Sequence, residues 1–303
     1  MTIIYDLEHI TTYRYTNPVT FGEHRAIFLP SVGFAGRILD YSLNTNVPSK
    51  QRWMMDTLSN NVAIIEFEDT PATELIVTYR ITGEHYGIPA ISDFPLEARA
   101  EIVPVQYTPD EWLDLSAFMR PHAADPDGRV AAWAKSFVKG DQDDTLDVLQ
   151  RMMNEIWNTL TYQARDVEGT QLPGETLRLQ SGTCRDYAWL MIEALRRLGF
   201  ACRFVSGYLY DRALDGGEVG MTGSGASHAW LQVYLPGAGW RAYDPTNRIT
   251  AGSDLIRVAI ARHPGQVIPL SGSWNGNATD YLGMDVKVSI RKLGSVPDFD
   301  RPK

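Results

Sequence analysis

The sequence predicts an α+β protein in which a strand-rich first part precedes a core of helices and strands. Apolar and polar residues alternate over about the first ninety positions, an amphipathic helical spacing begins near residue 129, and strand-like runs return after residue 200. These changes in pattern divide the chain into an N-terminal β-rich domain at 1–95, a connector at 96–128 and a core at 129–255. The strands expected at 256–303 are predicted to pack on either the core or the N-terminal domain.

The N-terminal domain is predicted to be an antiparallel β-sandwich. Residues 9–15, 63–67 and 74–81 carry period-two runs rich in β-branched and aromatic residues, and Pro18, Pro30 and Gly33 interrupt them. Several short alternating strands separated by turn residues are typical of a sandwich. In the connector, prolines at positions 104, 109, 121 and 126 separate short apolar pieces.

Two helices are predicted in the core. The first is capped near Asp144 or Thr145, and apolar residues at 146, 149, 153 and 156 line one of its faces. A loop containing Gly169 and Pro173 leads to the second helix, which begins at Cys184 and stops before Gly199. Strands are expected at 203–210, 228–235 and 240–243.

Charge and composition exclude several classes of protein. The net charge of -9 and the lack of a Lys/Arg cluster argue against a nucleic-acid partner. No apolar run reaches the roughly 20 residues that span a bilayer, and residues 1–6 lack the start of a secretion signal. We therefore expect a cytoplasmic protein without a membrane partner. Two cysteines in 303 residues fit a reducing compartment, and a disulfide between Cys184 and Cys202 is disfavoured.

Cys184 is the plausible nucleophile because it stands at the start of a predicted helix. Unpaired backbone N–H groups give that end a partial positive charge, which favours thiolate over thiol, and Arg185 acts in the same direction. A cysteine at such a junction can also simply pack as a small apolar residue. Its role therefore depends on what partners it has.

His228 and Asp244 are candidate partners because a hairpin could bring them together. The midpoint of the two positions is Pro236, so a hairpin turning there would place His228 directly opposite Asp244 and on the same face. A carboxylate in that place can hold one imidazole nitrogen while the other faces a thiol. The glycine-rich segment at 216–225 is predicted to be a mobile flap over the cleft.

Other chemistries fit these residues less well. A metal site formed by Cys184, Cys202, His228 and Asp244 would lack any Cys-x-x-Cys or His-x-x-x-His pairing. A serine hydrolase is disfavoured because the sequence has no Gly-x-Ser-x-Gly elbow. No metal ion and no cofactor are expected.

Three segments resemble the Cys, His and Asp blocks of bacterial transglutaminase-like proteins. They are GTCRDYA at 182–188, SHAW at 227–230 and GWRAYDPTN at 239–247, in the order and with the separation of that family. Residues 9–15, with His24 and the Leu29–Pro30 pair, are similar to the β-rich domain that precedes the core in one bacterial subgroup. The resemblance covers most of the chain.

The resemblance implies a papain-like core with a thiolate at Cys184, a base at His228 and an orienting acid at Asp244. Oxyanion stabilisation is expected from the backbone N–H of Cys184 and one side-chain donor, for which Tyr162 and Gln163 are candidates. We assign Asp186 to the helix N-terminus rather than to the reaction, and Cys202 to core packing.

The expected activity is cysteine-dependent acyl transfer at a peptide or carboxamide bond through a thioester. Hydrolysis, as in a protease or amidase, is favoured for a bacterial-type sequence, and the substrate would be a peptide or protein amide. Transfer to an amine, as in a transglutaminase or ligase, is the first alternative, because the triad does not distinguish the two. A non-catalytic peptide-binding scaffold is the second. Edge strands of the N-terminal domain could also support a homo-oligomer.

Overall fold

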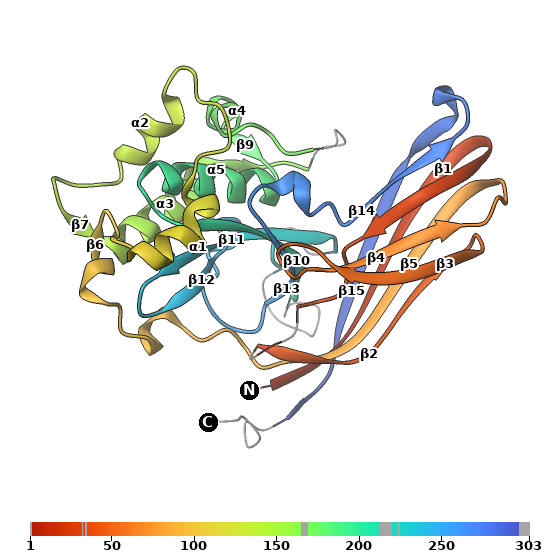
Figure 1. Ribbon diagram of the computed structural model, residues 1–303, viewed down its shortest axis with the longest axis horizontal. Coiled ribbons are helices and arrows are strands. Elements are labelled where there is room, and N and C mark those ends of the chain that lie inside the picture. Colours follow the sequence, from red (N-terminus) through yellow and green to blue (C-terminus); the bar gives the residue numbers. More distant parts are fainter. Residues whose placement is uncertain are drawn as a thin grey trace.

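A computed structural model describes residues 2–31, 33, 35–164, 169–211, 220–222 and 225–296. Strands fill one side of the molecule, and helices packed on a second, smaller sheet fill the other (Figure 1). This arrangement confirms the predicted α+β class with a strand-rich N-terminal part. No helix in these ranges is both long and apolar enough to cross a membrane. Most of the predicted flap at 216–225 lies outside the described residues.

The N-terminal strands form two sheets that share one long strand. They are β1 (Thr2–Ala26), β2 (Gly36–Thr45), β3 (Ser49–Met55), β4 (Asn61–Phe67) and β5 (Ala72–His85). Residues 3–14 of β1 pair with β5, and residues 24–26 pair with β4, so β1 passes from one sheet into the other. Strands β2 and β3 extend the two sheets by pairing with β5 and β4.

Two strands from the far end of the chain complete these sheets. β15 (Tyr281–Val296) pairs with residues 2–15 of β1, and β14 (Leu270–Asn275) pairs with residues 20–26. Both pairings are antiparallel. Along most of its length β1 therefore has a strand on each side, one from the beginning of the chain and one from its last forty described residues (Figure 1).

The connector contains a helix that the sequence pattern did not predict. Its short elements are η1 (Ile91–Asp93), η2 (Ala98–Ala100), β6 (Ile102–Val103) and α1 (Pro109–Met119), and β6 pairs with β7 (Asp143–Asp144). In α1 the hydroxyl of Thr108 accepts from the backbone N–H of Glu111, and the Glu111 carboxylate accepts from the N–H of Thr108. Pro109 occupies the first helical position, where proline is favoured.

The core places helices against a four-stranded antiparallel sheet with the order β12-β11-β10-β13. The strands are β10 (Cys202–Leu209), β11 (Ser227–Leu235), β12 (Gly239–Tyr243) and β13 (Leu255–Ala261). The helices are α2 (Arg129–Lys135), α3 (Thr145–Thr159), α4 (Pro173–Leu179) and α5 (Cys184–Arg197), with the short parallel strands β8 (Thr161–Tyr162) and β9 (Ser181–Gly182). Two 3-10 turns, η4 (Pro264–Gln266) and η5 (Ala278–Asp280), follow.

Both predicted core helices begin where the sequence placed them. Asp144 caps α3 by accepting from the N–H of Asp147, and α5 starts at Cys184. Beyond the end of α5, Gly199 has the positive φ of 89° that favours glycine. α4 was missed, because Pro173 and Gly174 look like loop residues although proline suits a first helical turn.

Candidate active site

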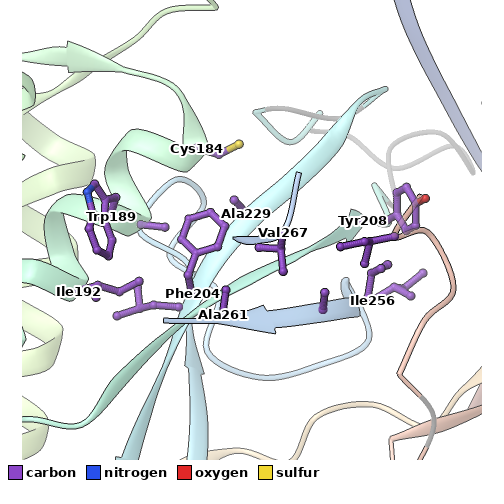
Figure 2. Close-up of a cluster of buried hydrophobic side chains, with 14 of the residues drawn as sticks. Cys184, Trp189, Ile192, Phe204, Tyr208, Ala229, Ile256, Ala261 and Val267 are labelled. Atoms are coloured by element: carbon purple, nitrogen blue, oxygen red, sulfur yellow. The ribbon is translucent and has the colours of Figure 1, made fainter. Parts of the chain in front are cut away.

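Cys184 is the first residue of α5, the helix that lies on the sheet. Figure 2 shows its sulfur pointing away from the core side chains of Trp189 and Ile192. The side chain is only 6% exposed. The thiol therefore lies at the electropositive end of a 14-residue helix and out of bulk solvent, where charge interactions are strong.

Asp186 fixes the start of this helix. Its carboxylate accepts from the backbone N–H of Thr183 at 2.8 Å and from the Thr183 hydroxyl at 2.9 Å, and its other oxygen accepts from the N–H of Gln171 at 2.6 Å. A side chain at Gly182 would place its Cβ 2.8 Å from that of Asp186, so glycine is needed there. These contacts support the assignment of Asp186 to the helix N-terminus.

His228 and Asp244 form a fully buried pair. The Nε2 of His228 lies 2.8 Å from Oδ2 of Asp244. The carboxylate also accepts from the N–H of Thr246 at 2.9 Å and from the amide of Asn247 at 3.2 Å. The remaining ring nitrogen, Nδ1, is buried without a hydrogen bond of ordinary geometry to any described residue, which leaves it available to the thiol of Cys184.

The predicted hairpin register is wrong by two residues. Leu231 pairs with Tyr243 and Leu235 with Gly239, so the position opposite His228 is that of Thr246, and Asp244 lies on the diagonal. The turn sets this register. Ala238 donates to the carbonyl of Leu235 at 2.9 Å and Gly237 has a φ of 89°, so the chain turns at Pro236 and Gly237, and Ala238 is one further residue before the pairing begins at Gly239. The two side chains stay on one face because a shift of two residues preserves the alternation.

The charges of the three residues are coupled. Burial would raise the pKa of Cys184, but the charge of His228, the N–H of Ala229 and the guanidinium of Arg185 outweigh it and lower that pKa. Burial would likewise lower the pKa of His228, but the charges of Asp244 and Cys184 raise it well above its usual range. A thiolate–imidazolium pair is thus favoured over the neutral pair.

The structure separates the two oxyanion candidates. Tyr162 is partly buried, and its hydroxyl lies against the Cys184 thiol, with which it forms a hydrogen bond. Burial, the charge of Cys184 and this hydrogen bond all raise the pKa of the phenol, so the hydroxyl stays protonated. Gln163 is exposed, and its backbone N–H donates to the carbonyl of Gly182 at 3.0 Å. Tyr162 therefore joins the Cys184 cluster, and the side chain of Gln163 does not.

Cys202 lies apart from this site. It is fully buried in β10, both cysteines are free thiols, and burial raises the pKa of Cys202 far above its ordinary value. Its carbonyl accepts from Arg196 at 2.8 Å. These features agree with a core-packing role.

Two residues that sequence reasoning missed also support the site. Asn247 donates to Asp244 and to the carbonyl of Thr222 at 3.1 Å, and its own amide oxygen accepts from the N–H of Thr222 at 3.0 Å. Trp230 stacks on His228 with ring centroids 6.0 Å apart. Trp230 belongs to the SHAW segment of His228, and Asn247 belongs to the DPTN segment of Asp244. Their closeness in sequence to these two residues could have indicated that they support the site.

An α+β core with a cysteine at the start of its helix, beside a histidine and an aspartate from the sheet, defines the papain-like class. Within that class, residues 131–245 match the sequence model of the transglutaminase-like superfamily, and residues 5–84 match that of the bacterial transglutaminase-like N-terminal region. The chain thus carries a transglutaminase-like core and, ahead of it, a bacterial transglutaminase-like N-terminal region. This confirms the resemblance found in the sequence.

Individual relatives add detail. An uncharacterized protein of Mycobacterium leprae is 28% identical over 288 residues, which covers 94% of this chain and 97% of that one. The protein-glutamine gamma-glutamyltransferase of Pseudomonas aeruginosa is 34% identical over 76 residues, covering 23% of this chain and 10% of the relative. The crystal structure of a candidate cysteine protease from Cytophaga hutchinsonii aligns with a TM-score of 0.71 over 98% of this chain and 93% of that one. At 19% identity, this last similarity shows the shared fold alone.

Proposed function

We propose that the protein is a cysteine-dependent acyl-transfer enzyme that hydrolyses a peptide or protein amide through a thioester on Cys184. The observation that carries this proposal is the electrostatic coupling of Cys184, at a helix start, to the His228–Asp244 pair. Because the pKa of the thiol is lowered and that of the imidazole is raised, the thiolate–imidazolium pair supplies a nucleophile and a proton donor at the same time.

The proposed first half of the reaction forms the acyl-enzyme. The Cys184 thiolate attacks the carbonyl carbon, a C–S bond forms, and the carbonyl oxygen becomes an oxyanion. The hydroxyl of Tyr162 and the backbone N–H of Cys184 are the proposed donors to that oxyanion. Protonated His228 then gives its proton to the amine nitrogen as the C–N bond breaks, which leaves a thioester and a neutral imidazole.

The second half regenerates the enzyme. Neutral His228 removes a proton from water, the resulting hydroxide attacks the thioester carbonyl, and the C–S bond breaks to release a carboxylic acid and restore the thiolate–imidazolium pair. Asp244 would hold the imidazole in place throughout, through its bond to Nε2. The cytoplasmic location predicted from the sequence would suit a thiol enzyme that must stay reduced.

Transfer to an amine is the second candidate, favoured by the match to the gamma-glutamyltransferase of Pseudomonas aeruginosa across 23% of this chain. An amine in place of water would attack the same thioester and form a new amide. A scaffold without activity is less well supported, because Cys184, His228 and Asp244 are all present and electrostatically coupled.

Incubation with a protein substrate such as casein, with and without a labelled primary amine, tests the proposal. Mass spectrometry of the Cys184 peptide should reveal an acyl adduct, and the product should be a free carboxylate whether or not the amine is present. Cys184→Ala should lose turnover and iodoacetamide labelling at neutral pH, whereas the matched control Cys202→Ala should keep both. Turnover by Cys184→Ala would refute the cysteine mechanism, and amine incorporation in place of hydrolysis would identify a transglutaminase or ligase.

A further inference from the structure

A cavity of about 70 Å³ separates the N-terminal sandwich from the core sheet. It lies on the face of that sheet opposite α5, because Trp230 and Leu255 belong to an apolar cluster distinct from the one that contains the α5 side chains. Ser31 and Gly36 contribute its wall on the sandwich side. Since roughly 10–15 Å³ of such volume holds one water molecule, the cavity has room for several waters or a small polyatomic ion.

Two arginines, Arg257 and Arg203, line this cavity or lie beside it without a carboxylate partner among the described residues. Arg257 of β13 lines the wall and is partly buried, and its side chain makes no hydrogen bond or ion pair with any described residue. Arg203 of β10 donates to the side chain of Gln232 at 2.9 Å and lies 4.1 Å from the ring of Trp240, again with no acid. Burial and the neighbouring charge of Arg257 together lower the pKa of Arg203 to about 9.

Arg241 of β12 also lines the cavity but differs from these two, because the negative charge of Asp93 acts on it. It is 8% exposed, its guanidinium lies 4.1 Å from the ring of Phe94, and its buried Nε has no hydrogen-bond partner among the described residues. Unpaired buried cations are costly, and proteins normally pair them. Arg203 and Arg257 have no acid partner among the described residues, although the chain as a whole carries a net charge of -9, so we looked for another source of negative charge.

The indole of Trp230 adds an unused donor. Trp230 is 1% exposed, lines the cavity, and its Nε1–H has no hydrogen-bond partner among the described residues. Buried N–H groups are almost always bonded to something. Arg257 and Trp230 therefore bring a cation and an N–H group without a described partner to the lining of one small cavity.

Glu84 is the one acid among the described residues that line the cavity, and it does not supply the missing charge. Arg37 binds both of its oxygens at 2.8 and 3.0 Å, and the Tyr86 hydroxyl donates to it at 3.1 Å. His85 accepts the N–H of Gly87 on Nδ1 at 2.9 Å, so it is neutral and donates from Nε2 to the carbonyl of Leu255.

We propose that this interdomain cavity binds a small oxyanion, with the Arg257 guanidinium and the Trp230 indole N–H as its ligands and Arg203 as a further positive charge nearby. A guanidinium offers two parallel N–H donors to a phosphate, sulfate or carboxylate group. The bound ion joins the sandwich to the core sheet. Because Trp230 also stacks on His228, the ion lies one side chain away from the candidate catalytic base.

Thermal unfolding and titration calorimetry with sodium phosphate, sulfate and acetate, against sodium chloride at equal ionic strength, test the proposal. We expect a saturable rise in Tm and a one-to-one binding isotherm for at least one oxyanion. A preference for phosphate or sulfate over acetate would identify a tetrahedral ligand, and the reverse a carboxylate. Equal, unsaturable effects of all salts would refute the site.

Variants assign the ligands. Arg257→Gln should abolish the response and, without oxyanion, be at least as stable as the wild type, since it removes an unpaired charge. Trp230→Phe keeps the stacked ring without its N–H and should raise the Kd about tenfold.

Arg291→Gln, which changes an exposed arginine paired with Asp6, is the matched control and should respond as the wild type does. An undiminished response in both Arg257→Gln and Trp230→Phe would overturn the proposal, and either variant alone suffices if the other fails to fold. These readouts are independent of turnover and so separate this site from the proposed reaction.

Discussion

Asp244 lies diagonally across the β11–β12 hairpin from His228 and binds its Nε2 at 2.8 Å. Every other contact of this carboxylate that we describe is also to a donor, namely the N–H of Thr246 and the side-chain amide of Asn247. Asp244 therefore both orients the imidazole and supplies the negative charge that raises the pKa of His228.

Replacement of Asp244 by Asn should uncouple thiol from imidazole. The amide of Asn keeps an acceptor for His228, but it turns an NH₂ group toward hydrogen-bond donors and removes the negative charge. The raised pKa of His228 should therefore fall, and the lowered pKa of Cys184 should rise. The thiolate would then appear only at higher pH. The pH dependence of iodoacetamide labelling at Cys184 measures this shift, and kcat/KM should fall at least about tenfold. An unchanged labelling profile would show that Asp244 does not tune the pair.

Replacement of Tyr162 by Phe should reduce turnover while leaving the thiolate in place. If its hydroxyl stabilises the oxyanion, its loss should lower kcat by about 100-fold with little change in KM. Gln163→Ala, at the neighbouring exposed position, should have no such effect. A similar loss in both variants would point to disturbance of β8 rather than to a lost donor.

Replacement of Asp186 by Asn should destabilise the protein rather than change its chemistry. The carboxylate accepts three hydrogen bonds at the start of α5, and an amide cannot accept all three. We expect a loss of about 1–3 kcal/mol in the free energy of unfolding, measured by urea denaturation. The pH at which Cys184 becomes reactive should stay the same, and a large change in it would implicate Asp186 in catalysis.

Mild acid should destabilise the contact between sandwich and core through His9. This histidine is 1% exposed, lies 3.1 Å from the Tyr208 hydroxyl and from the Thr11 hydroxyl, and burial lowers its pKa to about 4. The folded state keeps it neutral, while the unfolded chain takes up a proton below about pH 6.5. Stability should therefore fall between about pH 6.5 and 4, by up to about 3 kcal/mol from this residue.

Urea unfolding at pH 7 and pH 5 checks this expectation. His9→Gln should lose less stability than the wild type between the two pH values, although it starts from a lower value at pH 7. His24 and His85, whose pKa values burial also lowers, should still contribute to the slope in both proteins. Identical slopes would show that His9 is not the group responsible.

What the sequence predicted well was locally encoded. The starts of α3 and α5 depend on capping residues within three positions of each helix end, so Asp144 and Cys184 were placed correctly. The proximity of His228 to Asp244 needed only alternation and a short turn. The register prediction failed because three residues, 236–238, connect the two strands, so the centre of the hairpin is Gly237 rather than Pro236.

What the sequence did not predict depends on distant or ambiguous signals. Pro109 and Pro173 were read as breaks but begin α1 and α4, since proline both interrupts helices and starts them. The pairing of β15 with β1 joins residues more than 260 positions apart, for example Tyr15 and Tyr281, and no local pattern specifies it. The arginines around the interdomain cavity likewise come from separate strands.

The pairing of β1 with β14 and β15 has a consequence for how the protein is made. The first strand synthesised can find its partners β5 and β4 early, but one of its edges stays unpaired until residues 270–296 leave the ribosome. Fragments that stop near residue 95 or residue 261 would expose that edge and be prone to aggregation. A soluble fragment for separate study would need the C-terminal strands grafted back beside β1.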